Sequence, residues 1–197
     1  MTDTIRCIVG LGNPGAQYEL TRHNAGFWLV DHFADRLQAN FKTEKNLFAE
    51  VAKAHYEGRA IYLLKPNTFM NRSGQAVAAI ANFFKIKPQE FLVVHDELDL
   101  VPGAVKVKFG GGHAGHNGLR DIQKALGSPD FWRLRVGIGH PRDTGSQQAV
   151  ANYVLSNPRA QEWPELELAL ERCQRELPLL LGGEMEAAVR VLHGAHK

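Results

Sequence analysis

Short runs of apolar residues alternate along the chain with segments in which apolar residues recur at helical spacing. The short runs are 4–9, 48–55, 59–65, 91–95, 104–109 and 132–138. Runs of this length, bounded by turn-forming residues, are typical of buried strands. Glu57 and Gly58 separate two of them, so we expect residues 48–65 to form a hairpin.

The longer segments carry apolar residues on one helical face. They predict helices at 24–38, at 72–84, at 118–126 and in a C-terminal region of about 158–194. Pro178 should break or kink this last region, because proline removes a helical hydrogen bond. Strands that alternate with helices predict a three-layer α/β fold, and the hairpin makes the sheet mixed. We expect one domain over residues 1–197.

The first strand runs into "IVGLGNPG", which matches G-x-G-x-x-G at Gly10, Gly12 and Gly15. A dinucleotide site also needs a helix that begins within the motif and an acidic residue about 20 positions later. Pro14 and the following "AQYELTRHN" do not fit that helix. Two readings stay open. The glycines form a strand-to-loop turn that needs positive φ, or they shape a turn that presents Asn13 to a pocket.

Composition favours a globular protein of the cytoplasm. The apolar share is 44%, which is ordinary for a chain with a substantial core. The start "MTDTIRC" lacks a secretion-signal pattern, and no apolar run approaches the roughly 20 residues of a membrane span. The only cysteines, Cys7 and Cys173, do not suggest a disulfide framework, so we expect a cytoplasmic protein with no membrane contact.

The distribution of charged residues along the chain indicates a possible class of binding partner. The net charge is only +2, yet residues 104–142 hold seven basic side chains and two acidic ones. The basic ones are Lys106, Lys108, Arg120, Lys124, Arg133, Arg135 and Arg142. This local excess suggests a polyanionic partner, although a solvated basic face explains it equally well.

Polar and aromatic side chains gather after four of the predicted strands. They are Asn13, Tyr18 and His23; Asn67, Phe69, Met70 and Asn71; His95, Asp96, Glu97 and Asp99; and His113, His116 and Asn117. The loops at the carboxyl ends of strands form the ligand crevice of α/β sheets, so we expect them to meet. Taken singly, Asn71 and Asn117 read as helix N-caps.

These residue types limit the chemistry. No G-x-S-x-G elbow is present, and Cys7 lies within a strand. A zinc site could be drawn from His95, Asp96, His113 and His116, but their spacing is not that of a helical metal motif, so we expect no metal or other cofactor. A histidine oriented by a carboxylate, with amides nearby, can hydrolyse an activated carbonyl such as an ester.

Several long motifs resemble those of bacterial peptidyl-tRNA hydrolases. They are "GLGNPGAQYELTRHNAG", "KPNTFMNRSG", "HDELDLVPG", "GGGHAGHNGLRDI" and "FWRLRVGIGHP", in order between about residues 5 and 155. The resemblance implies a twisted mixed sheet and hydrolysis of the ester between a peptide and the terminal ribose of tRNA. It also implies an enzyme without a cofactor, and we expect it to act as a monomer.

The resemblance also assigns roles to residues. His23 would be the general base and Asp96 its support, and Asn71 and Asn117 would orient water and substrate. Further substrate contacts would come from Tyr18, Phe69, Met70 and His116 along the channel, Asn13 in selecting peptidyl over aminoacyl substrates, and Lys108 with Arg135 on a tRNA phosphate.

The sequence departs from the family at the outer basic surface. Relatives often carry a basic residue where this chain has Thr144, and "GHPRDTG" offers Arg142 instead. Two other classes stay open: a tRNA-binding protein without catalysis, and a metal-dependent amidase or peptidase.

Overall fold

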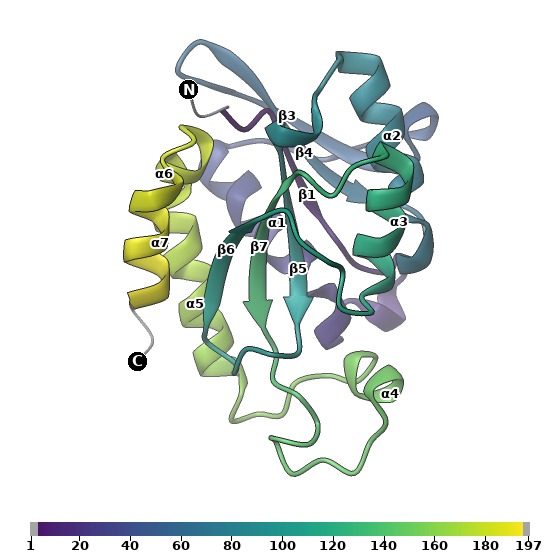
Figure 1. Cartoon of the computed structure of the whole chain (residues 1–197), viewed down its shortest axis with the longest axis vertical. Coiled ribbons are helices and arrows are strands. Elements are labelled where there is room, and N and C mark those ends of the chain that lie inside the picture. Colours follow the sequence, from purple (N-terminus) through teal and green to yellow (C-terminus); the bar gives the residue numbers. More distant parts are fainter. Residues whose placement is uncertain (1–3, 195–197) are drawn as a thin grey trace.

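A single seven-stranded sheet forms the centre of the molecule. The computed structural model describes residues 4–194, and the strand order is β2-β3-β4-β1-β5-β7-β6 (Figure 1). The strands are β1 (Cys7–Gly10), β2 (Lys42–Glu44), β3 (Ala49–Tyr56), β4 (Arg59–Pro66), β5 (Phe91–Glu97), β6 (Val105–Phe109) and β7 (Trp132–Gly137). Apart from the short β2, each corresponds to a run of apolar residues in the sequence.

Strand directions make the sheet mixed, as the hairpin predicted. The neighbouring strands β4, β1, β5 and β7 are parallel, whereas β2, β3 and β6 pair in antiparallel fashion. The carboxyl ends of the four parallel strands therefore meet at one edge, which is the lower end of Figure 1, where α4 lies. This edge brings the loops after β1, β4 and β5 together.

Helices cover both faces of the sheet. They are α1 (Ala25–Leu37), α2 (Ser73–Phe84), α3 (Asn117–Leu126), α4 (Val150–Val154), α5 (Trp163–Arg175), α6 (Leu177–Leu181) and α7 (Met185–Gly194). Short 3-10 turns are η1 (Ala16–Tyr18), η2 (Arg22–Asn24), η3 (Lys45–Leu47), η4 (Met70–Arg72) and η5 (Pro88–Glu90). One apolar core lies under α1 and α5–α7, and a second lies under α2 and α3, so the predicted three layers are confirmed (Figure 1).

Local sequence explains where several elements turn or end. Glu57 and Gly58 both have positive φ, 48° and 78°, as the tight turn of the predicted β3–β4 hairpin requires. Pro178 interrupts the C-terminal helical region as predicted, because α5 ends at Arg175 and Pro178 lies in the first turn of α6. The helices found between residues 4 and 194 are too short or too polar to cross a bilayer.

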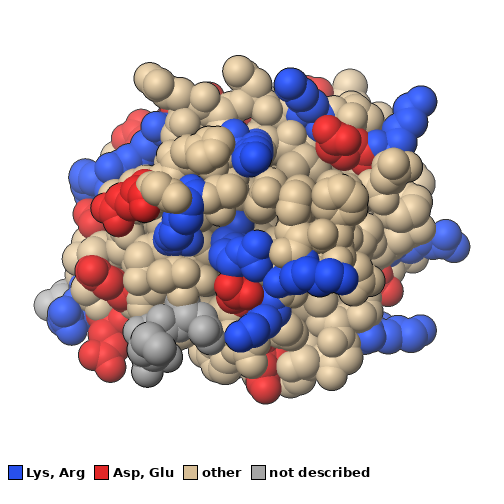
Figure 2. Space-filling model, turned by 90° about the horizontal axis from the view of Figure 1, so that it is seen from above, with Lys and Arg blue, Asp and Glu red and all other residues tan. Residues whose placement is uncertain are grey.

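The edge at the amino ends of the parallel strands carries mixed charge. Figure 2 views the molecule from this end and shows basic side chains interspersed with acidic ones. Arg6 here is bound within the molecule, because it donates to the carbonyl oxygens of Phe84 and Lys85 and lies 3.7 Å from Glu90. Arg59 likewise donates to the carbonyl of Ile5. These arginines therefore join secondary-structure elements.

Candidate active site

Close contact between β1 and α1 sets the position of His23. A Cβ atom at Gly10 would lie 2.5 Å from the Gly26 oxygen, and one at Gly26 would lie 2.5 Å from the Leu11 nitrogen. Only glycine allows this approach of helix to strand. As a result η2, which precedes α1, holds His23 at the carboxyl end of β5.

The glycines of "GLGNPG" therefore have different roles. Gly10 and Gly12 provide room for α1, since a Cβ at Gly12 would lie 2.8 Å from the Phe27 ring. Of the three, only Gly15 has positive φ, at 113°. The alternative of a turn that needs positive φ is therefore met at Gly15 and not at Gly10 or Gly12. The helix α1 begins only at Ala25, whereas a dinucleotide site requires a helix that begins within the glycine motif.

Asp96 lies at the centre of the site, between two histidines. Its Oδ2 is 2.9 Å from Nδ1 of His23, and its Oδ1 is 2.8 Å from Nε2 of His116. The ring centroids of the two histidines are 5.3 Å apart. Three segments far apart in the sequence, η2, the end of β5 and the start of α3, thus meet. The strand-end argument predicted this for His23 and Asp96. It is wrong for His116, because β6 is antiparallel and ends at the opposite edge, and the loop after β6 leads back to the site.

The hydrogen bonds fix the tautomers of both rings. Nδ1 of His116 accepts from the backbone N–H of Leu119 at 3.3 Å, so its Nε2 carries the proton that it donates to Asp96. His23 donates from Nδ1 to the other carboxylate oxygen. The Nε2 of His23 therefore keeps a lone pair that can accept a proton from water.

The electrostatics of the site follow from these contacts. Burial alone would lower the pKa of His23, but the charge of Asp96 and its hydrogen bond outweigh burial and raise the pKa above the ordinary value. Burial raises the pKa of Asp96, yet His23 and His116 lower it more, so the carboxyl is ionised at neutral pH. The site thus pairs a negative carboxylate with a histidine of raised basicity.

A third histidine, His95, lies beneath this group. Its side chain is 2% exposed, its Nδ1 lies 2.8 Å from the carbonyl oxygen of Asp96, and its ring centroid is 5.1 Å from that of His116. Burial, together with the nearby His116, lowers the pKa of His95 to about 3. His95 is therefore neutral, and it donates to the peptide group of the residue that carries the central carboxylate.

Asn13 joins two of the loops that surround the site. Its Oδ1 accepts from the backbone N–H of Met70 at 2.7 Å, and its backbone forms two hydrogen bonds with the side chain of Asn24. The side chain is 7% exposed. Since Oδ1 already accepts one hydrogen bond, the unengaged groups of the Asn13 amide are the N–H donors of Nδ2.

The N-cap interpretation of Asn71 and Asn117 is wrong. The cap of α2 is Arg72, and that of α3 is His116, whose ring accepts from the helix. Asn117 is the first residue of α3 and lines the same cavity as His23 and Asp96. Asn71 lies exposed in η4 and is outside the set of residues that line that cavity.

The predicted peptide-channel residues divide into exposed and buried ones. Phe69 is 59% exposed, and its ring meets that of Tyr18 edge to face at 6.3 Å. Met70 is only 4% exposed and packs in the core beside Leu11 and Gly118. Its side chain is therefore covered, and a substrate would contact the residues around it instead. The two rings form an apolar surface next to Asn13.

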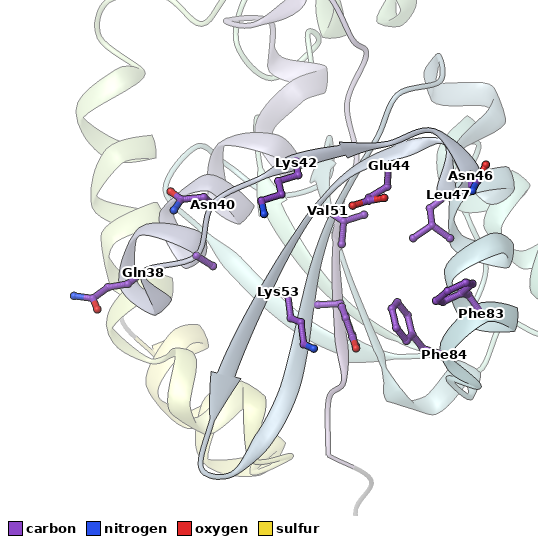
Figure 3. A pocket seen from close by; sticks show the side chains of 12 residues that line it. Gln38, Asn40, Lys42, Glu44, Asn46, Leu47, Val51, Lys53, Phe83 and Phe84 are labelled. Atoms are coloured by element: carbon purple, nitrogen blue, oxygen red, sulfur yellow. The ribbon is translucent and has the colours of Figure 1, made fainter.

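A cavity of about 550 Å³ adjoins the two histidines and Asp96. Besides His23, its walls include the segment 95–98, the loop 113–117, His140 and the residues Val150, Ala151 and Val154 of α4. A second cavity of about 560 Å³ lies at the β2 edge of the sheet, beside Phe83 and Phe84 (Figure 3). That cavity contains no histidine, and Glu44 is its only acidic side chain, so it lacks a base oriented by a carboxylate.

Basic side chains line one face of β6 and β7. Lys106 lies opposite Arg135, and Lys108 lies opposite Arg133. Arg133 is buried and donates to the carbonyl oxygens of the glycine-rich loop, so it supports that loop. Arg135 donates from Nε to Glu97 at 2.8 Å, which means that a phosphate would compete with this carboxylate.

Neither Thr144 nor Arg142 offers a free positive charge at the outer basic surface. Thr144 donates from Oγ1 to the carbonyl of Pro141, so its side chain turns back onto its own loop. Arg142 is exposed and lies between two carboxylates, 3.9 Å from Asp99 and 3.6 Å from Asp143. The two carboxylates therefore partly neutralise the positive charge of Arg142, and a bound anion would compete with them.

Within residues 4–194, one group of side chains has ligand atoms close enough to hold a metal. These atoms belong to His23, Asp96 and His116, and they all lie within 4.8 Å of one another. It differs from the zinc set drawn from the sequence, which used His95 and His113. Both oxygens of Asp96 already accept hydrogen bonds from the imidazoles, so the group is complete as a hydrogen-bonded set.

Comparisons with known proteins agree with this architecture. The family model described as peptidyl-tRNA hydrolase matches residues 7–197. A peptidyl-tRNA hydrolase of Bordetella parapertussis is 59% identical over 100% of this chain and 91% of its own length, and one of Neisseria meningitidis is 53% identical over 98% and 99%. The crystal structure of peptidyl-tRNA hydrolase from Acinetobacter baumannii superposes with a TM-score of 0.90 at 42% identity, covering 96% of this chain and 94% of that one.

Proposed function

The chain belongs to the peptidyl-tRNA hydrolase family, and we propose that it cleaves its substrate with His23 as the general base. The reaction is hydrolysis of the ester bond between a peptide and the terminal ribose of tRNA. The single observation that carries the proposal is the Asp96 carboxylate held between two imidazoles, because it leaves Nε2 of His23 free. A tRNA-binding protein without catalysis would not require that arrangement.

In the first step, water attacks the carbonyl carbon of the ester. As the new C–O bond forms, a proton of the water moves to Nε2 of His23, and the carbonyl oxygen becomes an oxyanion. The Asp96 carboxylate stabilises the imidazolium as it forms. The side-chain amide of Asn117 lines the same cavity and can donate to the oxyanion or orient the water.

In the second step, the ester C–O bond breaks and the ribose oxygen leaves. The proton on Nε2 passes to that oxygen, so the products are a peptide with a free carboxyl group and a tRNA with a free hydroxyl. His23 returns to its neutral form with Nδ1 still donating to Asp96. Proton, water and electron pairs balance without a covalent enzyme intermediate.

The outer parts of the substrate would meet different surfaces. The donors of Asn13, the half-buried ring of Tyr18 and the exposed ring of Phe69 suit the peptide. Lys108 and Arg135 suit a phosphate of the tRNA, to which cationic side chains bind with little sequence preference. Asn71 lies in η4 next to Met70, and we assign it to the orientation of substrate at that entrance.

The test is release of labelled peptide from peptidyl-tRNA by purified protein in the presence of EDTA. We expect full activity, because the proposed base needs no ion. Loss of activity on chelation and recovery with zinc would support the metal-dependent alternative, with His23, Asp96 and His116 as ligands. Tight tRNA binding without any release would support the non-catalytic alternative.

We also propose that a cytoplasmic monomer carries out this reaction. All of the residues assigned above belong to one chain, and both cysteines are free and buried. Light scattering should give the mass of one chain at concentrations where the protein is fully active. Specific activity that falls on dilution would instead indicate an active oligomer.

A further inference from the structure

The residue before His23 is a buried cation. The guanidinium of Arg22 is 4% exposed and lies over the ring of Tyr153, with its carbon 3.9 Å from the ring centroid. It donates to the carbonyl oxygen of Tyr153 at 3.1 Å and to the side chain of Ser156. The backbone N–H of Arg22 also donates to the Ser156 carbonyl at 3.0 Å. Arg22 therefore contacts the end of α4 through both its backbone and its side chain.

The counter-charge for Arg22 comes from the helical layer. Oε2 of Glu162 accepts from Nη2 of Arg22 at 2.9 Å, and Glu162 is 6% exposed. Glu162 immediately precedes α5, whose Trp163 packs on Trp28 of α1 with ring centroids 5.0 Å apart. The carboxylate that fixes Arg22 is thus attached to a helix packed in the core.

Helix α4 needs such support. It has five residues, too few for a helix to be stable alone in water. Its last carbonyl groups lack helical partners, and a guanidinium at this end supplies donors and a favourable charge. On its other side, the Tyr153 hydroxyl donates to the Ile138 carbonyl at 2.8 Å. Val150, Ala151 and Val154 of the same helix form a wall of the active-site cavity.

We propose that Arg22, fixed by Glu162, is a positioning residue that holds α4 against the active-site cavity and so sets the affinity for substrate. The proposal rests on the hydrolase function proposed above. The His23–Asp96 hydrogen bond does not pass through the guanidinium, so the chemical step should be largely independent of it. Loosening α4 should raise KM and leave kcat nearly unchanged.

The decisive variant replaces both partners, as Arg22→Met with Glu162→Leu. Removing Glu162 alone would leave the buried charge of Arg22 without its carboxylate and destabilise the whole protein, whereas removing both avoids this. We expect KM to rise about tenfold, because a loosened α4 no longer contributes to substrate binding. We expect kcat to stay within about twofold, because His23 and Asp96 are unchanged. Hydrogen exchange of the backbone amides in 150–156 should become faster, and the rest of the protein should exchange as before.

Arg36→Met is the matched control. Arg36 also joins two elements, since it donates from α1 to the carbonyl of Gln174 in α5, but it does not contact α4. Its loss should leave KM and the exchange of 150–156 unchanged. Arg22→Lys provides a second variant if the double variant does not fold, because lysine keeps the charge opposite Glu162 but lacks the planar fork that reaches Tyr153 and Ser156.

Three results would overturn the proposal. They are unchanged exchange in 150–156, faster exchange with unchanged KM, and a fall in kcat at unchanged KM, which would place Arg22 in the chemistry of His23. Failure of the proposed function is distinguishable. In that case wild-type protein releases no peptide, while exchange of 150–156 and binding of peptidyl-tRNA still report whether Arg22 positions α4 for affinity.

Discussion

Nε2 of His116 lies 2.8 Å from Oδ1 of Asp96, opposite the contact that His23 makes with the other oxygen of the same carboxylate. One carboxylate therefore orients two imidazoles. Only His23 keeps a free ring nitrogen, because Nδ1 of His116 is occupied by the Leu119 N–H. This asymmetry identifies which histidine can act as the base.

Asp96→Asn should change both the rate and its pH dependence. The Asp96 charge raises the pKa of His23, so without it burial dominates and the pKa falls. Neutral His23 is the active form, and the acid limb of kcat/KM should therefore move to lower pH. The plateau should fall about a hundredfold to ten-thousandfold, because the imidazolium is no longer stabilised. A pH profile from 5 to 8 that matches wild type would remove Asp96 from this role.

His95 should make the stability of the fold sensitive to acid. Its pKa in the folded state is about 3, whereas an unfolded histidine titrates near about 6.5. Below that value the unfolded chain binds a proton that the folded chain does not, so the free energy of unfolding should fall by about 1.4 kcal/mol per pH unit from this group. Urea unfolding of wild type and His95→Asn at pH 7 and pH 5 measures the effect.

The comparison isolates His95, because the other groups titrate in both proteins. The stability advantage of wild type over His95→Asn should shrink between pH 7 and pH 5. An advantage that stays constant would mean that His95 keeps an ordinary pKa in the folded protein.

Lys108→Ala and Arg135→Ala should weaken binding of peptidyl-tRNA more than they slow the chemistry. Each removes about one phosphate contact, so the slope of log affinity against log salt should fall by about one unit. Lys87→Ala is the control, since Lys87 is an exposed cation just before η5 and belongs to neither β6 nor β7. An unchanged slope with a collapsed kcat would place these residues at the reacting centre.

Glu97→Gln should tighten the same interaction. Glu97 holds Arg135 by a hydrogen bond of 2.8 Å, and a neutral amide competes less with phosphate for the guanidinium. Filter binding at several salt concentrations checks this. Weaker binding would show that Glu97 orients Arg135 for its partner.

Asn13→Asp should narrow the preference for peptidyl-tRNA over free aminoacyl-tRNA. The Oδ1 that accepts from Met70 is retained, while the donors are lost and a negative charge appears. That charge can compensate the ammonium group of an aminoacyl ester, whose unpaired burial is costly. The measurement is kcat/KM on both substrates, with Asn13→Ala beside it. An unaltered ratio in both variants would leave Asn13 a structural residue.

The long strands were predictable from the sequence because each carries its own apolar run, whereas their order in the sheet was not predicted. β2 was missed, since its three residues are exposed and polar. α4 was missed because five residues are too few for a periodic signal, and its stability comes from Arg22 and Tyr153. Neither β2 nor α4 is specified by a pattern of apolar residues within its own segment.

The site was predictable in outline for a topological reason. His23 follows β1 and Asp96 lies near the end of β5, two parallel strands whose carboxyl ends meet, and the structure brings them within hydrogen-bonding distance. His116 reaches the same place only through the loop after β6, because β6 is antiparallel and ends at the opposite edge of the sheet. The hydrogen-bond partner of each side chain was not predictable, because it depends on contacts between segments that are far apart in the sequence. The sequence indicates that a turn presents Asn13 to a pocket, but not that its Oδ1 accepts a hydrogen bond from the backbone N–H of Met70.

Chemical rescue of His23→Ala tests the central claim most directly. The variant should release labelled peptide at least about a thousandfold more slowly than wild type in the presence of EDTA. It should bind peptidyl-tRNA normally, and added imidazole should restore part of the rate by occupying the vacated space beside Asp96. Near wild-type release by His23→Ala would contradict the assignment of His23 as the general base.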